Sequence, residues 1–184
     1  MKKQQQSYAE RIATMRVLVV DSFFEFRQLV RTMLIRDIGV ASVEDAKDGE
    51  QALKILKEEG GFDLVIADTT VRPMGGIALT AMIRTGGAKV DEHMPVIAVS
   101  GQPSLADIMA ARDAGVDEYL AKPLSAKILE LRIRSVIEHP RPFVHAANFL
   151  GPERRRHDKT GFDGVERRAS ATREFLAAKD SKNA

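Results

Sequence analysis

The chain has 184 residues, of which 44% are hydrophobic and 29% charged. This composition is typical of one globular domain with room for an appendage. The chain contains no cysteine, which excludes a disulfide framework and a thiolate metal site. No apolar run approaches the roughly 20 residues of a membrane span, and the basic N-terminus lacks the apolar core of a signal peptide. We therefore expect a cytoplasmic protein without membrane insertion.

Charge is divided unevenly along the chain. Residues 15–139 carry 15 Lys or Arg and 19 Asp or Glu, a net charge of −4. Residues 140–184 carry 10 basic and 6 acidic residues, a net charge of +4, and the first 14 residues add +2. A polyanionic partner is therefore expected to bind the C-terminal segment rather than the body.

Short apolar runs alternate with longer amphipathic segments along the body. Apolar runs rich in β-branched residues predict strands at residues 16–20, 42–46, 64–67, 96–99 and 118–120. Apolar residues at helical spacing predict helices at residues 23–37, 50–57, 76–84, 105–114 and 124–138. Because strands and helices alternate, we expect a five-stranded, doubly wound parallel sheet of the flavodoxin-like α/β type, with strand order 2-1-3-4-5.

The segment His139-Pro140-Arg141-Pro142 ends the last predicted helix, because proline restricts its predecessor and cannot donate a backbone hydrogen bond. We therefore divide the chain into a flexible N-terminal segment (1–14), a folded domain (15–139) and a Pro/Gly/Arg-rich extension (140–184). Apolar residues between 143 and 150 are candidates for an extended strip that docks on the body. The remaining basic tail is expected to be mostly disordered on its own.

Polar residues stand at the C-terminal ends of four predicted strands. Asp21 follows the first strand, Asp68 the third and Ser100 the fourth, while Tyr119 and Lys122 belong to the fifth. Because the C-terminal ends of parallel strands converge on one edge of the sheet, these side chains are expected to form one pocket. A carboxylate there can accept a phosphoryl group, while a lysine and a divalent cation offset the charge on the transferred oxygens.

Six segments carry a joint pattern: residues 17–21, Asp48-Gly49-x-x-Ala52-Leu53, residues 63–68, residues 95–100, Ala114-Gly115-Val116-Asp117-x-Tyr119-Leu120 and Lys122-Pro123-Leu124-Ser125. Their order and spacing resemble the CheY-like receiver domain of bacterial response regulators, over about residues 15–139. By this resemblance Asp68 is the phosphoacceptor, Ser100 follows the phosphoryl group, Tyr119 is the switch aromatic and Lys122 pairs with phosphate. The resemblance also implies a histidine kinase as partner and a docking face made by helix 4, strand 5 and helix 5.

The sequence departs from the receiver pattern after the first strand, where the family usually has two adjacent acids and this chain has Asp21-Ser22. By resemblance, the missing acid is a direct ligand of magnesium, which prefers charged oxygen ligands. The remaining candidate ligands are Asp21, Asp68 and Thr70, and we expect a weakened magnesium site. Two interpretations stay open. In one, Asp68 is phosphorylated in a pocket of Asp21, Ser22, Thr70, Ser100, Tyr119 and Lys122; in the other, the receiver is degenerate and serves as a scaffold.

The extension contains two Gly-x-Glu-Arg-Arg segments, which begin at residues 151 and 164. Arginine binds phosphate oxygens and guanine edges bidentately and stacks on bases, and carboxylates accept the N–H groups of guanine. A ligand that contains both phosphates and guanines, such as cyclic di-GMP, would use the whole candidate set. Its members are Arg154, Arg155, Arg156, His157, Asp158, Asp163, Arg167 and Arg168.

A receiver followed by an arginine-rich extension resembles the Cle-type cyclic di-GMP effectors of alphaproteobacteria, which bind the dinucleotide through the extension and act at the flagellar motor. The resemblance implies a signalling adaptor without dedicated catalysis. Its tail is expected to fold on ligand binding and, together with the receiver face, to dock on a protein partner such as the flagellar motor switch.

Three other functions are alternatives to this one. The first is a phosphorylation-controlled regulator with a passive tail. The second, nucleic-acid binding by the tail, is disfavoured because six acids interrupt the basic residues and no helix-turn-helix pattern follows the receiver. The third, a hydrolase, lacks a recognisable set of nucleophile, base and orienting group, and the four histidines show no metal-ligand spacing.

Overall fold

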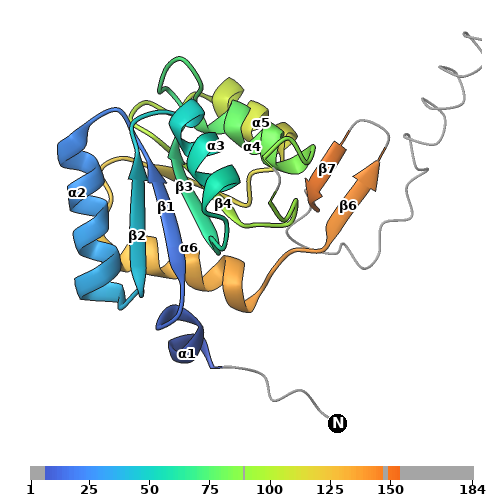
Figure 1. Cartoon of the computed structure of the whole chain (residues 1–184). Coiled ribbons are helices and arrows are strands. Elements are labelled where there is room, and N and C mark those ends of the chain that lie inside the picture. Colours follow the sequence, from blue (N-terminus) through green and yellow to red (C-terminus); the bar gives the residue numbers. More distant parts are fainter. Residues whose placement is uncertain (1–6, 89, 147–148, 154–184) are drawn as a thin grey trace, which may run out of the picture. The chain divides into compact units, whose positions relative to one another are not determined.

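The computed structural model describes residues 7–88, 90–146 and 149–153. Its central element is a five-stranded parallel sheet with the order β2-β1-β3-β4-β5, which confirms the predicted topology (Figure 1). The strands are β1 (Arg16–Val20), β2 (Ser42–Ala46), β3 (Leu64–Asp68), β4 (Val96–Ser100) and β5 (Glu118–Ala121). Each differs from its predicted range by at most one residue at its C-terminal end.

The connecting helices are α2 (Phe24–Thr32) with the π-helical segment η1 (Met33–Ile38), α3 (Gly49–Glu58), α4 (Gly76–Arg84), α5 (Leu105–Ala114) and α6 (Ala126–Glu138). Side chains that accept backbone N–H groups fix several of the helix starts. Asp48 caps α3, Ser104 forms a reciprocal capping box with Asp107 in α5, and Ser125 caps α6. The single helix predicted at residues 23–37 is divided into two segments in the structure, because its last turns are π-helical.

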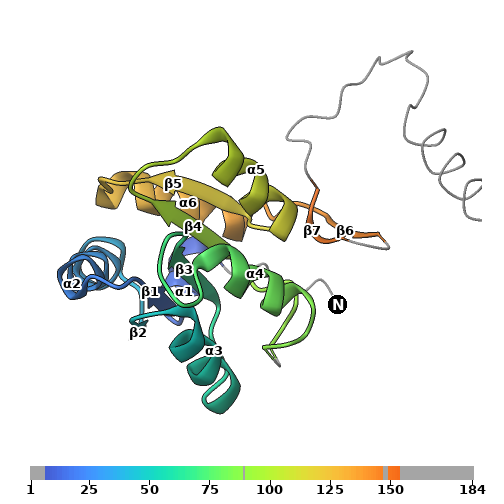
Figure 2. The same ribbon diagram turned by 90° about the horizontal axis from the view of Figure 1, so that it is seen from above.

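Successive residues of each strand point to opposite faces of the sheet, and both faces are covered. On one face, Val19 and Ile66 pack in a cluster with Leu34 of η1 and Ile133 of α6. On the other face, residues such as Leu18 and Val65 pack against α3 and α4, and α5 covers the region of β4. Figure 2 shows these two helix layers on opposite sides of the sheet. Burial on both faces explains why the strands are nearly continuous apolar runs.

Two short elements lie outside the receiver pattern. The N-terminal segment, predicted to be flexible, contains helix α1 (Tyr8–Ile12), whose Ile12 is buried in the core. The apolar strip predicted after residue 142 is an antiparallel hairpin of β6 (Phe143–Ala146) and β7 (Phe149–Pro152). This hairpin packs against α5. Among the residues that the structure describes, no helix is both long and apolar enough to cross a membrane.

Candidate phosphorylation pocket

The register of the sheet brings the predicted polar residues to one edge. Asp68 lies opposite Val99 of β4, and Ser100 lies opposite Ala121 of β5. Asp21 continues the edge beyond β1, because its N–H donates to the carbonyl of Ala46 at the end of β2. The parallel strands therefore end level with one another, as the sequence predicts.

Lys122 forms the centre of this pocket. Its ammonium Nζ lies 2.5 Å from Asp21 Oδ2 and 2.7 Å from Asp68 Oδ2. Asp21 and Asp68 are 1% and 5% exposed, so this single cation is shared by two carboxylates that are almost removed from water. Its own burial lowers the pKa of Lys122, but the hydrogen bonds to both carboxylates outweigh burial and raise that pKa above its ordinary value. Lys122 is therefore protonated at neutral pH.

Thr70 holds the other oxygen of Asp68. Its backbone N–H and its hydroxyl both donate to Asp68 Oδ1 at 2.6 Å. Burial raises the pKa of Asp68, but the hydrogen bonds from Lys122 and Thr70 outweigh it and hold the pKa below 3.8, its ordinary value. Asp68 is therefore an ionised carboxylate with both oxygens engaged, and attack on a phosphoryl donor requires one of these contacts to open.

Ser100 and Tyr119 lie at the β4–β5 side of the pocket. The hydroxyl of Ser100 is buried and accepts the N–H of Gln102 at 3.3 Å, while its carbonyl accepts the N–H of Lys122 at 2.8 Å. Tyr119 packs with Ala98 and Ala111, and its buried hydroxyl finds no hydrogen-bond partner within the described part of the chain. A buried phenol without a partner is energetically costly, which is the condition expected of a ring that changes rotamer.

The donor set does not fit a tight magnesium site. Ser22 stands where a second acid would follow β1, and it is exposed. The two remaining carboxylates, Asp21 and Asp68, already share the Lys122 cation. In the described ranges, no group of three or more His, Asp or Glu side chains is arranged to hold a metal ion. Magnesium prefers charged oxygen ligands, so we expect this pocket to bind it only weakly.

Two residues of α2 support the pocket, and the sequence analysis did not identify either of them. The ring of Phe26 lies 3.8 Å from Lys122 Nζ, a cation–π contact. Arg27 donates to the carbonyl of Asp21 at 2.8 Å and pairs with Asp45 of β2 at 2.8 Å, which fixes the loop after β1. The helical spacing marks Phe26 as a core residue, so the sequence alone gives no signal of its contact with the cation.

A cavity of about 510 Å³ opens beside Asp68 and Lys122. Its walls include Phe23, directly before α2, and Leu29 of α2, whose side chains are 67% and 48% exposed. Arg72, a cation in the loop that follows Asp68, is exposed. Among the described residues it forms no ion pair with either pocket carboxylate.

The predicted docking face corresponds to α5, β5 and α6. It carries five exposed large apolar side chains: Leu105, Ile108, Met109, Ile128 and Leu131. The predicted ligand-binding residues of the tail lie outside the described residues. They are Arg154, Arg155, Arg156, His157, Asp158, Asp163, Arg167 and Arg168.

The sheet order and the pocket of carboxylate, lysine and hydroxyl groups define a receiver-type signalling domain. A sequence model of the response regulator receiver domain matches residues 17–134. The chain therefore belongs to the response regulator receiver family. The match ends before the β6–β7 hairpin and the arginine-rich extension.

Similar proteins include two chemotaxis proteins. The chain is 33% identical over 124 residues to the chemotaxis protein CheY of Pseudomonas aeruginosa, a match that covers 67% of this chain and 97% of that protein. It is 35% identical over 124 residues to CheY-3 of Vibrio cholerae, covering 67% and 92%. Among solved structures, Vibrio cholerae CheY4 superposes with a TM-score of 0.61 and 26% identity, covering 68% of this chain and 100% of that one.

Proposed function

We propose that this chain is a CheY-like signalling adaptor that binds cyclic di-GMP through its arginine-rich tail and then docks on a protein partner, the flagellar motor switch. One observation carries the proposal. The arginines of the first motif begin at Arg154. Arg141, which contacts Asp117 of the receiver, and Pro142 hold the preceding residue, Glu153. Its N–H donates to the carbonyl of Pro142 at 2.7 Å, and its carbonyl accepts from Arg141 at 3.3 Å. Fixing one end of the tail lowers the entropy cost of ordering the rest on a ligand.

The chemistry of the tail supports a ligand that contains phosphate and guanine. Four arginines lie in the two repeated segments, at positions 154, 155, 167 and 168, and Arg156 directly follows the first segment. Arginine is suited to bidentate contacts with phosphate and to stacking on purines. The interspersed Asp158 and Asp163 disfavour a nucleic acid, whose binding relies on uninterrupted positive charge, but they suit the N–H groups of guanine.

The receiver supplies the proposed output surface. Large apolar side chains of α5 and α6, the helices that flank β5, are exposed to solvent. Contiguous exposed apolar patches mark protein interaction sites. The similar proteins of Pseudomonas aeruginosa and Vibrio cholerae are named chemotaxis proteins, which supports motility as the process. We propose that the ordered tail and this face together form the surface that the partner recognises.

Calorimetric titration of cyclic di-GMP tests this function. The full chain should bind, whereas a chain that ends at Glu153 should not, since it keeps the receiver and hairpin but lacks the arginine motifs. GTP, which carries both guanine and phosphate, serves as a control for recognition of the cyclic dinucleotide, and a DNA duplex as a control for charge alone. Equal binding to both chains, or tighter binding of the duplex, would contradict the proposal.

Phosphorylation of Asp68 is the second candidate function, and the pocket geometry is compatible with it. Asp68 is ionised, buried and paired with Lys122, as an acyl-phosphate nucleophile requires. Incubation with a small acyl-phosphate donor, followed by gel electrophoresis that retards phosphoproteins, tests it. A shifted band in the wild-type chain that is missing in Asp68→Asn would support the regulator with a passive tail.

A further inference from the structure

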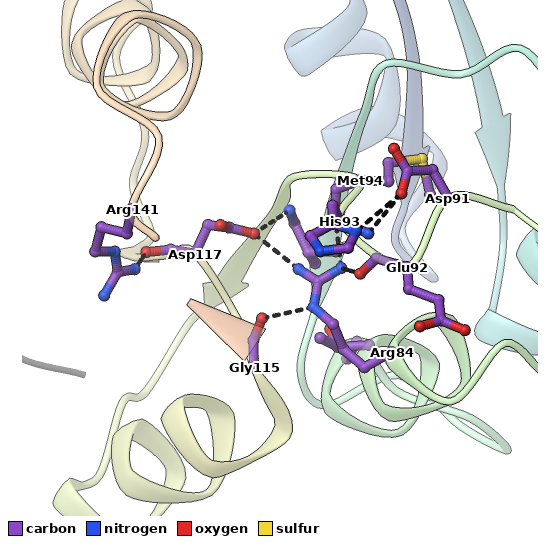
Figure 3. Close-up of polar contacts among 11 residues, drawn as sticks. Arg84, Asp91, Glu92, His93, Met94, Gly115, Asp117 and Arg141 are labelled. Carbon is purple, nitrogen blue, oxygen red and sulfur yellow. Dashed lines mark hydrogen bonds and ion pairs between the residues drawn. The ribbon is translucent and has the colours of Figure 1, made fainter. Parts of the chain in front are cut away.

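A buried arginine at the opposite end of the sheet forms the best-connected polar centre outside the pocket. Arg84, the last residue of α4, has a side chain that is 2% exposed. Its Nε donates to the carbonyl of Gly115, and its Nη1 donates to the carbonyls of Glu92 and Met94 at 2.7 and 2.8 Å. Its Nη2 pairs with Asp117 Oδ2 at 2.9 Å (Figure 3). One guanidinium thus joins α4, the segment before β4 and the α5–β5 connection.

The β6–β7 hairpin is seated on this centre. The ring of Phe143 in β6 lies 5.1 Å from the guanidinium carbon of Arg84, and its centroid lies 4.3 Å from that of His93. Arg141, just before the hairpin, donates to the carbonyl of Asp117 and to the carbonyl of Glu153. Figure 3 shows Arg141 reaching the Asp117 segment. Arg141 therefore holds both ends of the hairpin against the start of β5.

Two glycines allow the hairpin to approach the end of α5. A Cβ atom on Gly115 would lie 2.8 Å from the carbonyl oxygen of Leu150, and a Cβ on Gly151 would lie 2.8 Å from Gly115 Cα. Both distances are shorter than real Cβ atoms tolerate, so the two backbones touch without room for side chains. Gly115 also ends α5 with a φ of 89°. Any movement of β7 away from this position therefore releases the residue that joins α5 to β5.

We propose that the hairpin, Phe143–Pro152, is a coupling element whose seating on Arg84 and Gly115 links ligand binding by the tail to the α5–β5 docking face. This inference rests on the proposed function, because the ligand must bind the tail. The tail starts directly after the hairpin, and Gly115 begins the short α5–β5 connection, which ends at Asp117 directly before β5. The same short connection joins the exposed side chains of α5 to Tyr119 in β5. A ligand that favours the seated hairpin therefore also restrains the docking face.

Linkage makes this coupling measurable from either side. If the seated hairpin favours the ligand-bound tail, loss of seating must weaken the ligand by the same factor by which the ligand stabilises seating. A hairpin that only adds stability to the fold predicts something different. Its loss would raise the population of unfolded chain but would leave the affinity of the folded chain for the ligand unchanged.

The test uses hydrogen exchange and calorimetry on the full chain with cyclic di-GMP as probe. Arg141→Ala removes the contacts to Asp117 and Glu153. Gly151→Val inserts a wedge against Gly115 without backbone strain of its own, since Gly151 does not have a positive φ. Arg112→Ala is the matched control, because it removes the same charge from an exposed site on α5 where the guanidinium contacts its neighbour Asp113.

We expect cyclic di-GMP to slow exchange in residues 105–121 of the wild-type chain and of Arg112→Ala. In Arg141→Ala and Gly151→Val this protection should be lost, and the dissociation constant should rise about tenfold. Unchanged protection and affinity in both variants would overturn the coupling while leaving the proposed function intact. Absence of binding to the wild-type chain would overturn the proposed function and the coupling together, so the two failures are distinguishable.

Discussion

At the scale of single residues, the pocket is organised by one cation shared between two carboxylates. Lys122 is the group that offsets the charge of both Asp21 and Asp68, which are almost fully buried. Removing one partner from such an arrangement leaves buried charge without compensation, which is more costly than never having had the pair. The stability of the receiver should therefore depend on Lys122 independently of any phosphoryl transfer.

We predict that Lys122→Met lowers the free energy of unfolding by about 2–4 kcal/mol at pH 7, somewhat below the usual range for a fully buried pair because Lys122 is partly exposed. The same substitution made in an Asp68→Asn chain should cost less, since one fewer buried carboxylate is then left unpaired. Urea unfolding of the four chains measures this coupling. Equal costs in both backgrounds would show that Lys122 does not stabilise Asp68.

The two pKa shifts predict where this stabilisation disappears. The pKa of Asp68 is lowered, so its contribution is present above 3.8 and is lost as the pH falls through the pKa of the folded state. The pKa of Lys122 is raised, so its contribution is present below 10.5 and is lost as the pH rises through the folded value. The stability difference between the wild-type and Lys122→Met chains should therefore be constant between about pH 5 and 9. Urea titrations that extend below pH 5 and above pH 9 should show this difference shrink towards both extremes.

Ser22 stands next to Asp21, where a carboxylate would add a charged oxygen ligand for magnesium. We predict that Ser22→Asp raises the affinity for Mg²⁺ or Mn²⁺ at least about tenfold, because a third carboxylate then reaches the site. Calorimetric titration with either metal measures the change. Thr32→Glu is the control, since it adds the same charge at an exposed position of α2 away from the pocket. If both variants gained equally, general charge rather than a ligand set would be responsible.

At the scale of secondary-structure elements, Arg84 shows how one side chain joins three segments. Arg84 itself ends α4, and its acceptors belong to the loop before β4 and to the α5–β5 connection. Asp117, its acidic partner, also accepts the N–H of Val96 at 2.8 Å, and burial raises the pKa of Asp117 even though Arg84 opposes this. The buried Arg84–Asp117 pair is stable in the interior because the guanidinium nitrogens of Arg84 all donate to nearby acceptors.

We predict that Arg84→Met destabilises the chain by about 3–5 kcal/mol, because it leaves Asp117 and three carbonyls without their donor. Arg84→Lys should recover only part of the loss, since an ammonium cannot reach acceptors spread around a planar fork. Chemical denaturation followed by circular dichroism measures both. A cost within about 0.5 kcal/mol for Arg84→Met would show that the network is dispensable.

The sequence predicted the elements whose signals are local. Strand ranges followed from short β-branched runs, and the pocket followed because Asp21, Asp68 and Lys122 sit where parallel strands must end together. The roles of Arg84 and Arg141 could not be predicted, because their partners lie up to 33 residues away in the sequence. From the sequence, an arginine at the end of an apolar helix is ordinarily predicted to be exposed to solvent, where it interacts favourably with the helix C-terminus.

The hairpin shows the same limitation at the level of pairing. Apolar residues between 143 and 150 predicted a docked extended strip, but not that two strands pair in the register Phe143–Pro152 and Val144–Gly151. Helix α1 was missed because its five residues are too few for a clear helical period. Tertiary contacts hold α1 on the domain, including a hydrogen bond from Arg11 to the carbonyl of Ile137.

At the scale of the whole molecule, the chain consists of a receiver body joined to a basic extension, and the boundary between them determines which part can be removed. The sequence places that boundary after His139, whereas residues 141–153 contact Asp117, Arg84 and Gly115 of the body. We predict that a chain ending at Glu153 keeps the stability of the full chain, and that a chain ending at His139 loses about 2 kcal/mol through lost hydrogen bonds and apolar burial. Thermal unfolding of both truncated chains checks this. Equal melting temperatures would show that the folded domain ends at residue 139.

The central claim is that specific arginines of the tail, rather than its general charge, bind cyclic di-GMP. The most direct measurement is calorimetric titration of the dinucleotide into three full-length chains at two salt concentrations. One is the wild type, one replaces Arg154, Arg155 and Arg156 by Ala, and the control replaces Lys159, Arg173 and Lys179 by Ala, with the same loss of charge from the same tail. The account predicts binding to the wild type and the control and its loss in the triple-arginine variant. Equal weakening of both variants, or no binding to any chain, would contradict it.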